Sequence, residues 1–273
     1  MPHFVKHLLT KVVSLYLIYF PNQSARITRK NIQLAYPSMP KHQQHQLSND
    51  SIEELSQKFF DLLTTWVKPA TDSLDQVTTV HSFSEFQQSS DGQPTLILLP
   101  HLGNWELFGL WLTQHRIYTA MFRPLRVPKI SELVRHARER GGNHLVPATT
   151  AGVKEMLKRL KDNECAVVLP DQVPKEGQGV YASFFGHDVL TPVLPYRLAL
   201  ATKARVFIGA ALKTQVGYEV VLKKLNDPIA DEQDHWLAMM NREIEALVRM
   251  YPAQYQWEYR RFRNAPDGSL RYP

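Results

Sequence analysis

The chain has 273 residues, of which 44% are hydrophobic and 21% charged, so it can bury a large core and is not a disordered chain. Its one cysteine excludes a disulfide framework and a cysteine-rich metal site. The formal net charge of +6 indicates an anionic partner, which could be nucleic acid, an anionic membrane or a phosphorylated substrate.

The first 49 residues combine basic side chains with an apolar run and contain no Asp or Glu. The apolar run, residues 8–20, has 13 residues including a lysine, whereas a membrane-spanning helix needs about 20 apolar residues. No small-residue cleavage site follows it, so we expect it to be retained. We expect it to lie on an anionic membrane surface, with packing in an ordinary core as the alternative. The basic residues are Lys6, Lys11, Arg26, Arg29, Lys30 and Lys41.

Residues 1–70 are predicted to form a helical region, because apolar side chains recur there at helical spacing. A polar stretch at residues 87–94 separates this region from a second one, residues 90–273, which we expect to form one compact unit. The expected helices of the first region are residues 8–20, 24–36 and about 40–66.

From residue 95 onward, short apolar runs alternate with amphipathic helical patterns. This alternation predicts an α/β fold with a mixed, mostly parallel sheet flanked by helices, beside the N-terminal helical membrane-docking region. Cys165 falls within an apolar run and is expected in a buried strand. The expected strands are residues 95–99, 117–122, 144–146, 165–169, 205–212 and 218–223, and the expected helices are residues 104–114, 130–140, 151–161, 191–202 and 232–250.

The loop after the first of these strands carries the strongest chemical signal, because sites in open α/β sheets form at the carboxyl ends of strands. His101 lies in this loop, Gly103 permits a tight turn, Asn104 can cap the next helix, and Glu106 falls in its first turn. A carboxylate beside an imidazole makes the histidine a better general base near neutral pH. We therefore predict that His101 removes a proton from a hydroxyl, with Glu106 as its partner. A structural histidine is the alternative.

Residues 101–106 read His-Leu-Gly-Asn-Trp-Glu, which resembles the His-x4-Asp/Glu motif of the bacterial lipid A late acyltransferases, the lauroyl and myristoyl transferase family. Three further blocks are similar to segments of that family and occur in the same order: residues 122–125, residues 170–192 and residues 252–262. The second of these contains a Phe-Phe-Gly turn that the family places in a hairpin. The resemblance covers the chain from about residue 20 to residue 263.

The resemblance implies roles for individual residues. His101 would be the base and Glu106 its partner, Arg123 would contact a substrate phosphate, and Asp171 would lie in the site. A helix ending near Gly141 would direct two arginines toward the same sheet edge, although a solvated helix face explains them equally well. The residues expected to bind substrate are Arg123, Asp171, Arg138, Arg140, Gly103 and Asn104.

The resemblance further implies an O-acyltransferase that moves a fatty acyl group from an acyl carrier protein thioester to a hydroxyl of a lipid A precursor. The acceptor would be an anionic glycolipid, the enzyme would need no cofactor and no metal, and no acyl-enzyme would form. It would work at the cytoplasmic face of the bacterial inner membrane as a peripheral or monotopic protein. The alternatives are an acyltransferase for another glycolipid or phospholipid, and an inactive basic lipid-binding module. A nucleic-acid binder is the least favoured, because no recognisable binding motif is present.

Overall fold

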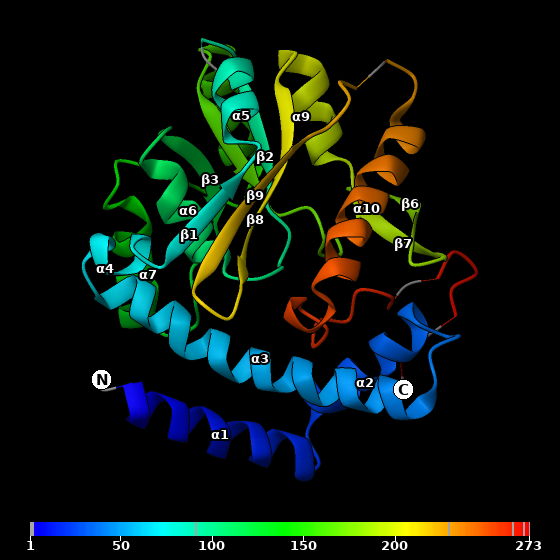
Figure 1. Ribbon diagram of the computed structural model, residues 1–273. Coiled ribbons are helices and arrows are strands. Elements are labelled where there is room, and N and C mark those ends of the chain that lie inside the picture. Colours follow the sequence, from blue (N-terminus) through cyan, green and yellow to red (C-terminus); the bar gives the residue numbers. More distant parts are fainter. Residues whose placement is uncertain (1–2, 91, 229, 264, 270, 273) are drawn as a thin grey trace.

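The computed structural model describes residues 3–90, 92–228, 230–263, 265–269 and 271–272. A seven-stranded sheet forms the centre of the molecule, helices cover both of its faces, and the N-terminal helices lie across one end of it (Figure 1). The fold is therefore α/β with a mostly parallel sheet flanked by helices, as the sequence predicts.

The sheet has the order β1-β9-β8-β2-β5-β3-β4, and every neighbouring pair is parallel except β8 and β9. Every strand expected from the apolar runs is present. β1 is an additional edge strand, which its mixed and half-exposed side chains did not reveal. The strands are β1 (Val77–His81), β2 (Thr95–Leu98), β3 (Tyr118–Phe122), β4 (His144–Pro147), β5 (Cys165–Val168), β8 (Arg205–Lys213) and β9 (Tyr218–Lys224).

Alternate residues of β2 enter two different cores, because successive side chains of a strand point to opposite faces of the sheet. Leu96 and Leu98 contribute to one core, whereas Ile97 and the following Leu99 contribute to the other. Both faces are buried, which explains the continuous apolar run of this central strand. The first core includes residues of α8 (Thr150–Lys161), α9 (Leu194–Thr202) and α10 (Gln233–Met250), and the second includes residues of α5 (Phe83–Ser90) and α6 (Trp105–Thr113).

A separate two-stranded hairpin, β6 (Gly179–Phe184) and β7 (His187–Pro192), packs beside α10. Phe185 and Gly186 form its turn with positive φ angles of 51° and 73°. The helix expected at residues 191–202 begins later than predicted, at Leu194, because Thr191 and Pro192 complete β7. Cys165 is fully buried in β5, as expected.

Four helices precede the sheet: α1 (His3–Tyr19), α2 (Gln23–Ala35), α3 (Lys41–Val67) and the short α4 (Ala70–Leu74). α1 packs along α3, with Thr10 and Ser14 buried and its large apolar side chains exposed. Within the part of the chain that the structure describes, no helix has the length and apolar character needed to cross a membrane.

Candidate active site

His101 and Asp171 lie beyond the carboxyl ends of two neighbouring parallel strands, β2 and β5. These strands pair in register, with Leu98 opposite Val168. His101 and Asp171 each follow that pair by three residues, so the two loops bring their side chains together. This edge is where sites form in open α/β sheets.

Asp171 binds His101 through both carboxylate oxygens. Its Oδ1 lies 2.8 Å from Nδ1 of the imidazole, and its Oδ2 accepts a 2.8 Å hydrogen bond from the backbone N–H of His101. An ionised carboxylate can only accept hydrogen bonds, so Nδ1 carries the ring proton and Nε2 remains as the basic nitrogen. The imidazole is thereby fixed in one orientation and one tautomer.

The protein interior stabilises the charge on Asp171, whose side chain is 3% exposed. Burial alone would raise the pKa of this carboxyl, but His101, through its charge and its hydrogen bonds, and Arg261 hold that pKa below its usual range. Arg261 is buried and donates to a carbonyl and a hydroxyl of β7. Burial and the charge of Asp171 raise the pKa of Tyr255 well above its ordinary value, so this phenol stays protonated.

The basic nitrogen Nε2 of His101 faces a side-chain amide. Nε2 of Gln172 lies 3.2 Å from it and also donates to Oε1 of Gln256 at 3.1 Å. The ring of Trp105 packs edge-on against the imidazole, with 5.1 Å between centroids. The His101 side chain keeps 13% of its surface exposed, so the ring is held tightly without being sealed from solvent.

Gly103 and Asn104 set the path of the loop that carries His101. Gly103 has φ +62°, and a Cβ at this position would lie 2.1 Å from the carbonyl oxygen of Ala211, so only glycine fits. The Asn104 side chain accepts from the backbone N–H of Leu107 at 3.0 Å and caps α6. Both residues were predicted to bind substrate, and their contacts in the structure are with the protein itself.

A buried lysine of α3 supports the same loop. The Lys58 ammonium donates to the carbonyl of Gln254 at 2.9 Å, and the backbone N–H of Gly103 donates to the same oxygen at 3.1 Å. Nζ also lies 5.1 Å from the ring centroid of Trp105. Burial lowers the pKa of Lys58, although nearby carboxylates oppose that shift. Helix α3 is therefore directly connected to the residues around His101.

Glu106 does not occupy the position predicted for it beside the imidazole. Its carboxylate lies in the first turn of α6 and pairs with Arg138 of α7 (Pro128–Glu139), through Nε at 3.1 and 3.0 Å and through Nη2. His101 instead turns toward the loop after β5, where Asp171 binds Nδ1. The carboxylate that orients His101 is Asp171, and the prediction for Glu106 is corrected accordingly.

The predicted arginines differ in what they contact. Arg140 donates to the carbonyls of Thr65 and Lys68, each at 2.8 Å, and so connects the end of α7 to α3 rather than pointing toward His101. Arg138 is held by Glu106 and lies over the ring of Phe122, 5.6 Å from its centroid. Arg123 follows β3 directly and is exposed, at the same edge of the sheet as the ends of β2 and β5.

Four further side chains surround the pair of His101 and Asp171: Gln172, Lys58, Tyr255 and Arg261. The sequence assigned no role to the first three, and it offered Arg261 only as part of a basic cluster that could hold phosphates. Asp171 was expected in the site, but its contact with His101 depends on the pairing of β2 with β5, which no local sequence pattern reveals. Lys58 comes from a segment far away in sequence, and no local pattern marks it.

A sequence profile of the bacterial lipid A biosynthesis acyltransferase family matches residues 1–264, nearly the whole chain. The chain belongs to this family. The acyltransferase is 23% identical to a lipid A biosynthesis acyltransferase of Haemophilus influenzae, over 99% of this chain and 86% of that protein. It is 22% identical to the lipid A biosynthesis lauroyltransferase of Escherichia coli, over 91% of this chain and 82% of that protein.

A different acceptor class appears among the other relatives of this acyltransferase. A phosphatidylinositol mannoside acyltransferase of Mycolicibacterium smegmatis is 27% identical over half of this chain and 45% of its own length. The relatives of this chain therefore include enzymes named for two kinds of glycolipid.

Proposed function

We propose that this acyltransferase moves a fatty acyl group from an acyl carrier protein thioester to a hydroxyl of a lipid A precursor. The observation that carries the proposal is the imidazole of His101, whose Nδ1 is bound by a buried carboxylate and whose Nε2 is left basic. The family, and the names of two relatives that match most of this chain, support the acceptor class.

In the proposed reaction, Nε2 of His101 takes the proton of the acceptor hydroxyl as the oxygen attacks the thioester carbonyl. The new ester C–O bond forms, the C–S bond breaks, and the thiolate leaves with its electron pair. Asp171 stabilises the imidazolium that results, because its carboxylate remains charged. The amide of Gln172, 3.2 Å from Nε2, stands where the hydroxyl would have to approach, so it must move aside when the acceptor binds.

Two arginines at this edge of the sheet are proposed to bind the anionic acceptor. Arg123 is exposed immediately after β3. Arg138 donates hydrogen bonds from Nε and Nη2 to the carboxylate of Glu106. Within the described residues its Nη1 donates no hydrogen bond, so we propose that Nη1 binds the acceptor. Glu106 would thus act by positioning Arg138 rather than by touching the imidazole.

The proposed location is the cytoplasmic face of the inner membrane, with α1 lying on the bilayer. The surface of α1 supports this, because large apolar side chains are exposed along the helix while Thr10 and Ser14 face α3. A surface helix of a soluble protein normally buries its apolar side chains and exposes its polar ones. The exposed side chains are Leu8, Leu9, Val12, Val13, Leu15, Tyr16 and Tyr19.

A mannosylated phosphatidylinositol is the second candidate acceptor, favoured by the match to mycobacterial enzymes named for it. That match covers at most half of this chain, whereas the lipid A relatives match nearly all of it, so a lipid A precursor is the first choice.

The test is acyl transfer by the purified protein from acyl carrier protein thioester to each acceptor in turn, followed by mass spectrometry of the lipid. Wild type should add one acyl mass to the lipid A precursor, and His101→Ala should lower turnover by about 10² to 10⁴, the usual contribution of a general base. His235→Ala, which removes an exposed imidazole of α10, is the matched control and should retain full turnover.

Wild-type turnover in His101→Ala would overturn the assignment of the base. Transfer only to the mannosylated lipid would change the acceptor, and transfer to no acceptor would favour the inactive lipid-binding module.

A further inference from the structure

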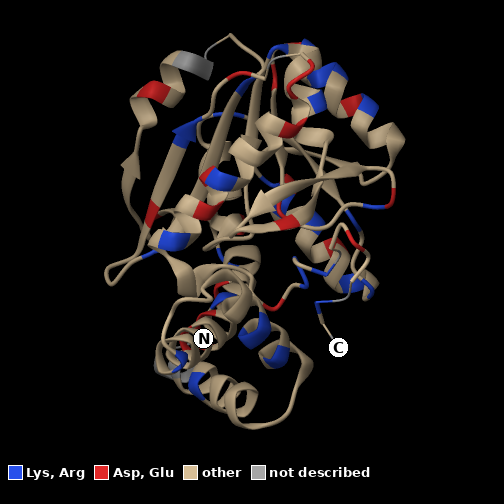
Figure 2. Ribbon diagram, turned by 90° about the vertical axis from the view of Figure 1, so that its right-hand side faces the viewer, with Lys and Arg blue, Asp and Glu red and all other residues tan. Residues whose placement is uncertain are grey.

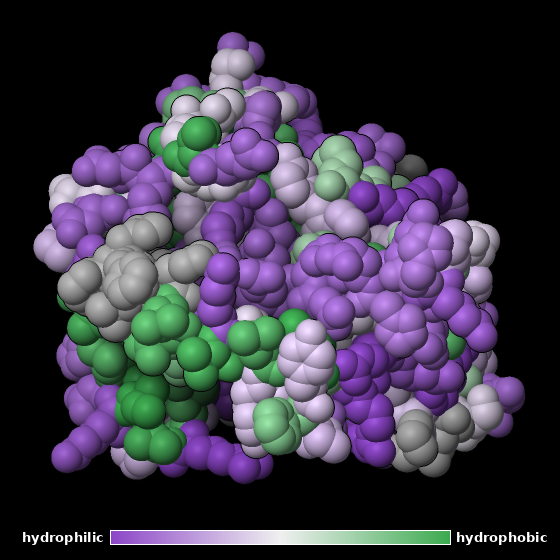
Figure 3. All heavy atoms as spheres, turned by 60° about the horizontal axis from the view of Figure 1, so that its bottom comes forward, coloured by the Kyte–Doolittle hydropathy of each residue, from purple (hydrophilic) through white to green (hydrophobic). Residues whose placement is uncertain are grey.

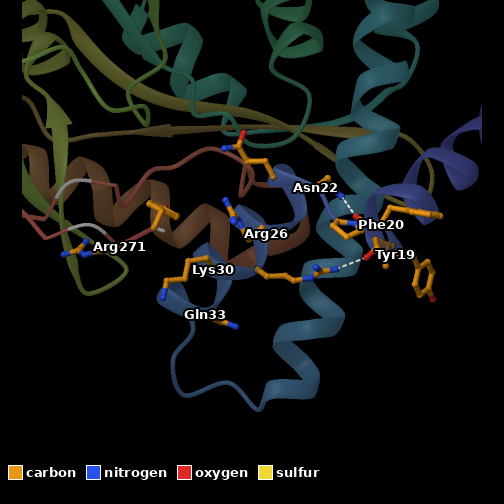
Figure 4. A pocket seen from close by; sticks show the side chains of 12 residues that line it. Tyr19, Phe20, Asn22, Arg26, Lys30, Gln33 and Arg271 are labelled. Atoms are coloured by element: carbon orange, nitrogen blue, oxygen red, sulfur yellow. Dashed lines mark hydrogen bonds between the residues drawn. The ribbon is translucent and has the colours of Figure 1, made fainter.

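A cavity with a volume of about 1260 Å³ lies at the corner between α1 and α2. The cavity is lined by the end of α1, one side of α2 and part of the C-terminal segment (Figure 4). Its lining includes no residue of the His101 site. The residues that matter for its chemistry are Tyr19, Phe20, Arg26, Lys30, Gln33 and Arg271.

Hydrogen bonds fix the corner around the cavity. Arg29, which also lines it, donates to the carbonyl of Ile18 at 2.9 Å and so ties α2 to the last turn of α1. Asn22 donates to the carbonyls of Leu17 and Phe20, at 2.7 and 2.8 Å, and its side chain caps α2. The cavity is therefore shaped by the folded chain before any ligand arrives.

The charge of the cavity is entirely positive. Arg26, Arg29, Lys30 and Arg271 line it, and no Asp or Glu does. Within the described ranges, Arg26 and Lys30 form no ion pair and no side-chain hydrogen bond, while Arg271 donates only to the carbonyl of Asp188, at 3.2 Å. Figure 2 shows several Lys and Arg positions on the N-terminal helices at the bottom of the view. Unpaired cations gathered in one concave site favour an anion with several acceptor oxygens.

The cavity adjoins the apolar surface of α1. Tyr19 and Phe20 belong to its lining and are 75% and 59% exposed. Figure 3 shows apolar side chains gathered on part of this face of the molecule, next to a broad hydrophilic area. An amphipathic helix lies with its apolar side at the boundary between headgroups and acyl chains, which places a neighbouring basic cavity at the level of lipid phosphates.

We propose that this cavity binds the phosphate of an anionic phospholipid of the bilayer on which α1 lies. Arg26, Lys30 and Arg271 contact the phosphate oxygens, and Tyr19 and Phe20 contact the upper part of the acyl chains. The inference rests on the membrane docking proposed for α1 and adds a headgroup preference to it.

A bilayer phospholipid fits better than the acceptor glycolipid. The acceptor must reach Nε2 of His101, whereas the cavity is built from α1, α2 and the C-terminal segment and shares no residue with the loops after β2, β3 and β5. Binding there would hold the protein on the membrane without occupying the catalytic site.

The test is co-sedimentation of the full chain with vesicles of phosphatidylcholine alone and of phosphatidylcholine containing a minority of phosphatidylglycerol. The variant Arg26→Gln/Lys30→Gln should weaken binding to the anionic vesicles roughly 25-fold, because each basic residue near the surface contributes about fivefold. Its binding to neutral vesicles should be unchanged, because the apolar surface of α1 is intact.

The matched control is Lys154→Gln/Lys158→Gln, which removes the same charge from the exposed side of α8. It should leave binding to anionic vesicles close to that of wild type. Equal losses in the two double variants would mean that net charge alone attracts the protein and would overturn the inference. Full retention of binding in Arg26→Gln/Lys30→Gln would overturn it as well.

The outcome is independent of the catalytic assignment. His101→Ala should bind both kinds of vesicle as wild type does, and Arg26→Gln/Lys30→Gln should keep wild-type turnover with acceptor dispersed in detergent. If wild type binds no vesicle at all, the docking of α1 fails together with this inference. If it binds but the two double variants do not differ, only the headgroup preference fails.

Discussion

The pairing of a buried carboxylate with a largely buried imidazole fixes the orientation of the imidazole and the charge around it. Asp171 binds the ring and the backbone of the same residue, His101, so a rotation of the Asp171 side chain would break two hydrogen bonds. Arg261 adds a buried positive charge nearby, which helps to keep the carboxylate ionised. A buried carboxylate that keeps its charge is also sensitive to acid, because protonation removes these interactions.

We predict that Asp171 contributes stability that depends on pH. Its pKa in the folded protein lies below the ordinary value of 3.8, so the unfolded state binds this proton more readily. The contribution is therefore fully present above that ordinary value and is lost as pH falls through it toward the folded value. In urea unfolding, the difference in free energy between wild type and Asp171→Asn should be largest at pH about 6 and should shrink below about pH 4.

The exposed carboxyl of Asp162 provides the control, and Asp162→Asn should differ little from wild type at any of these pH values. A difference for Asp171→Asn that stays constant across the range would mean that folding does not lower the pKa of this carboxyl, and would contradict the prediction.

The sequence correctly placed His101 in the loop after β2, but it paired His101 with Glu106, which contacts Arg138 in the structure. Glu106 is only five residues from His101 in the chain, so local sequence reasoning selects it as the partner. Asp171 is 70 residues from His101 and becomes its neighbour only through the pairing of β2 with β5. The order of the strands depends on contacts between residues far apart in the chain, and local sequence patterns do not reveal it.

At the scale of elements, ion pairs and buried polar side chains connect helices that the sheet alone would not join. Glu106 and Arg138 connect α6 to α7. Asn31 of α2 donates to the carbonyls of Trp257 and Tyr259, at 2.6 and 2.7 Å, and so attaches an N-terminal helix to the C-terminal segment. These contacts make the N-terminal helices part of the same packed body as the residues around His101.

The ion pair between Glu106 and Arg138 yields a prediction about stability. The two side chains are 6% and 29% exposed, so replacing Arg138 by Met leaves a buried carboxylate without its partner. Such a loss costs 3 to 5 kcal/mol, and the partial exposure of Arg138 places the expected cost at about 3 kcal/mol. The double variant Glu106→Met/Arg138→Met should recover most of this loss in equilibrium unfolding.

A double variant as unstable as Arg138→Met, or a single variant as stable as wild type, would show that the two charges are not coupled. Arg135→Met is the control for the loss of a guanidinium. It removes a half-exposed arginine of the same helix, whose ion pair with Glu139 is open to solvent, and should cost far less.

At the scale of the whole molecule, the positions of most strands and helices follow from apolar periodicity, because the central strands are buried on both faces and the helices on one. The hairpin β6 and β7 shows where periodicity fails. Thr191 and Pro192 have the residue types of a helix start, yet they complete a strand because Thr191 is buried and hydrogen-bonded to Arg261. In α1, polar side chains are buried and large apolar ones are exposed, because Thr10 and Ser14 lie on the side that packs against α3. The sequence did not show which side of α1 would face α3.

The measurement that tests the central claim most directly is the turnover of Asp171→Asn with acyl carrier protein thioester and the lipid A precursor. The amide keeps the shape of the carboxylate but cannot stabilise an imidazolium, so turnover should fall by about 10² to 10⁴ while circular dichroism shows a folded protein. Asp171→Glu should recover part of the loss, and Asp162→Asn should match wild type. A folded Asp171→Asn protein with wild-type turnover would contradict the assignment of His101 and Asp171 as the catalytic pair.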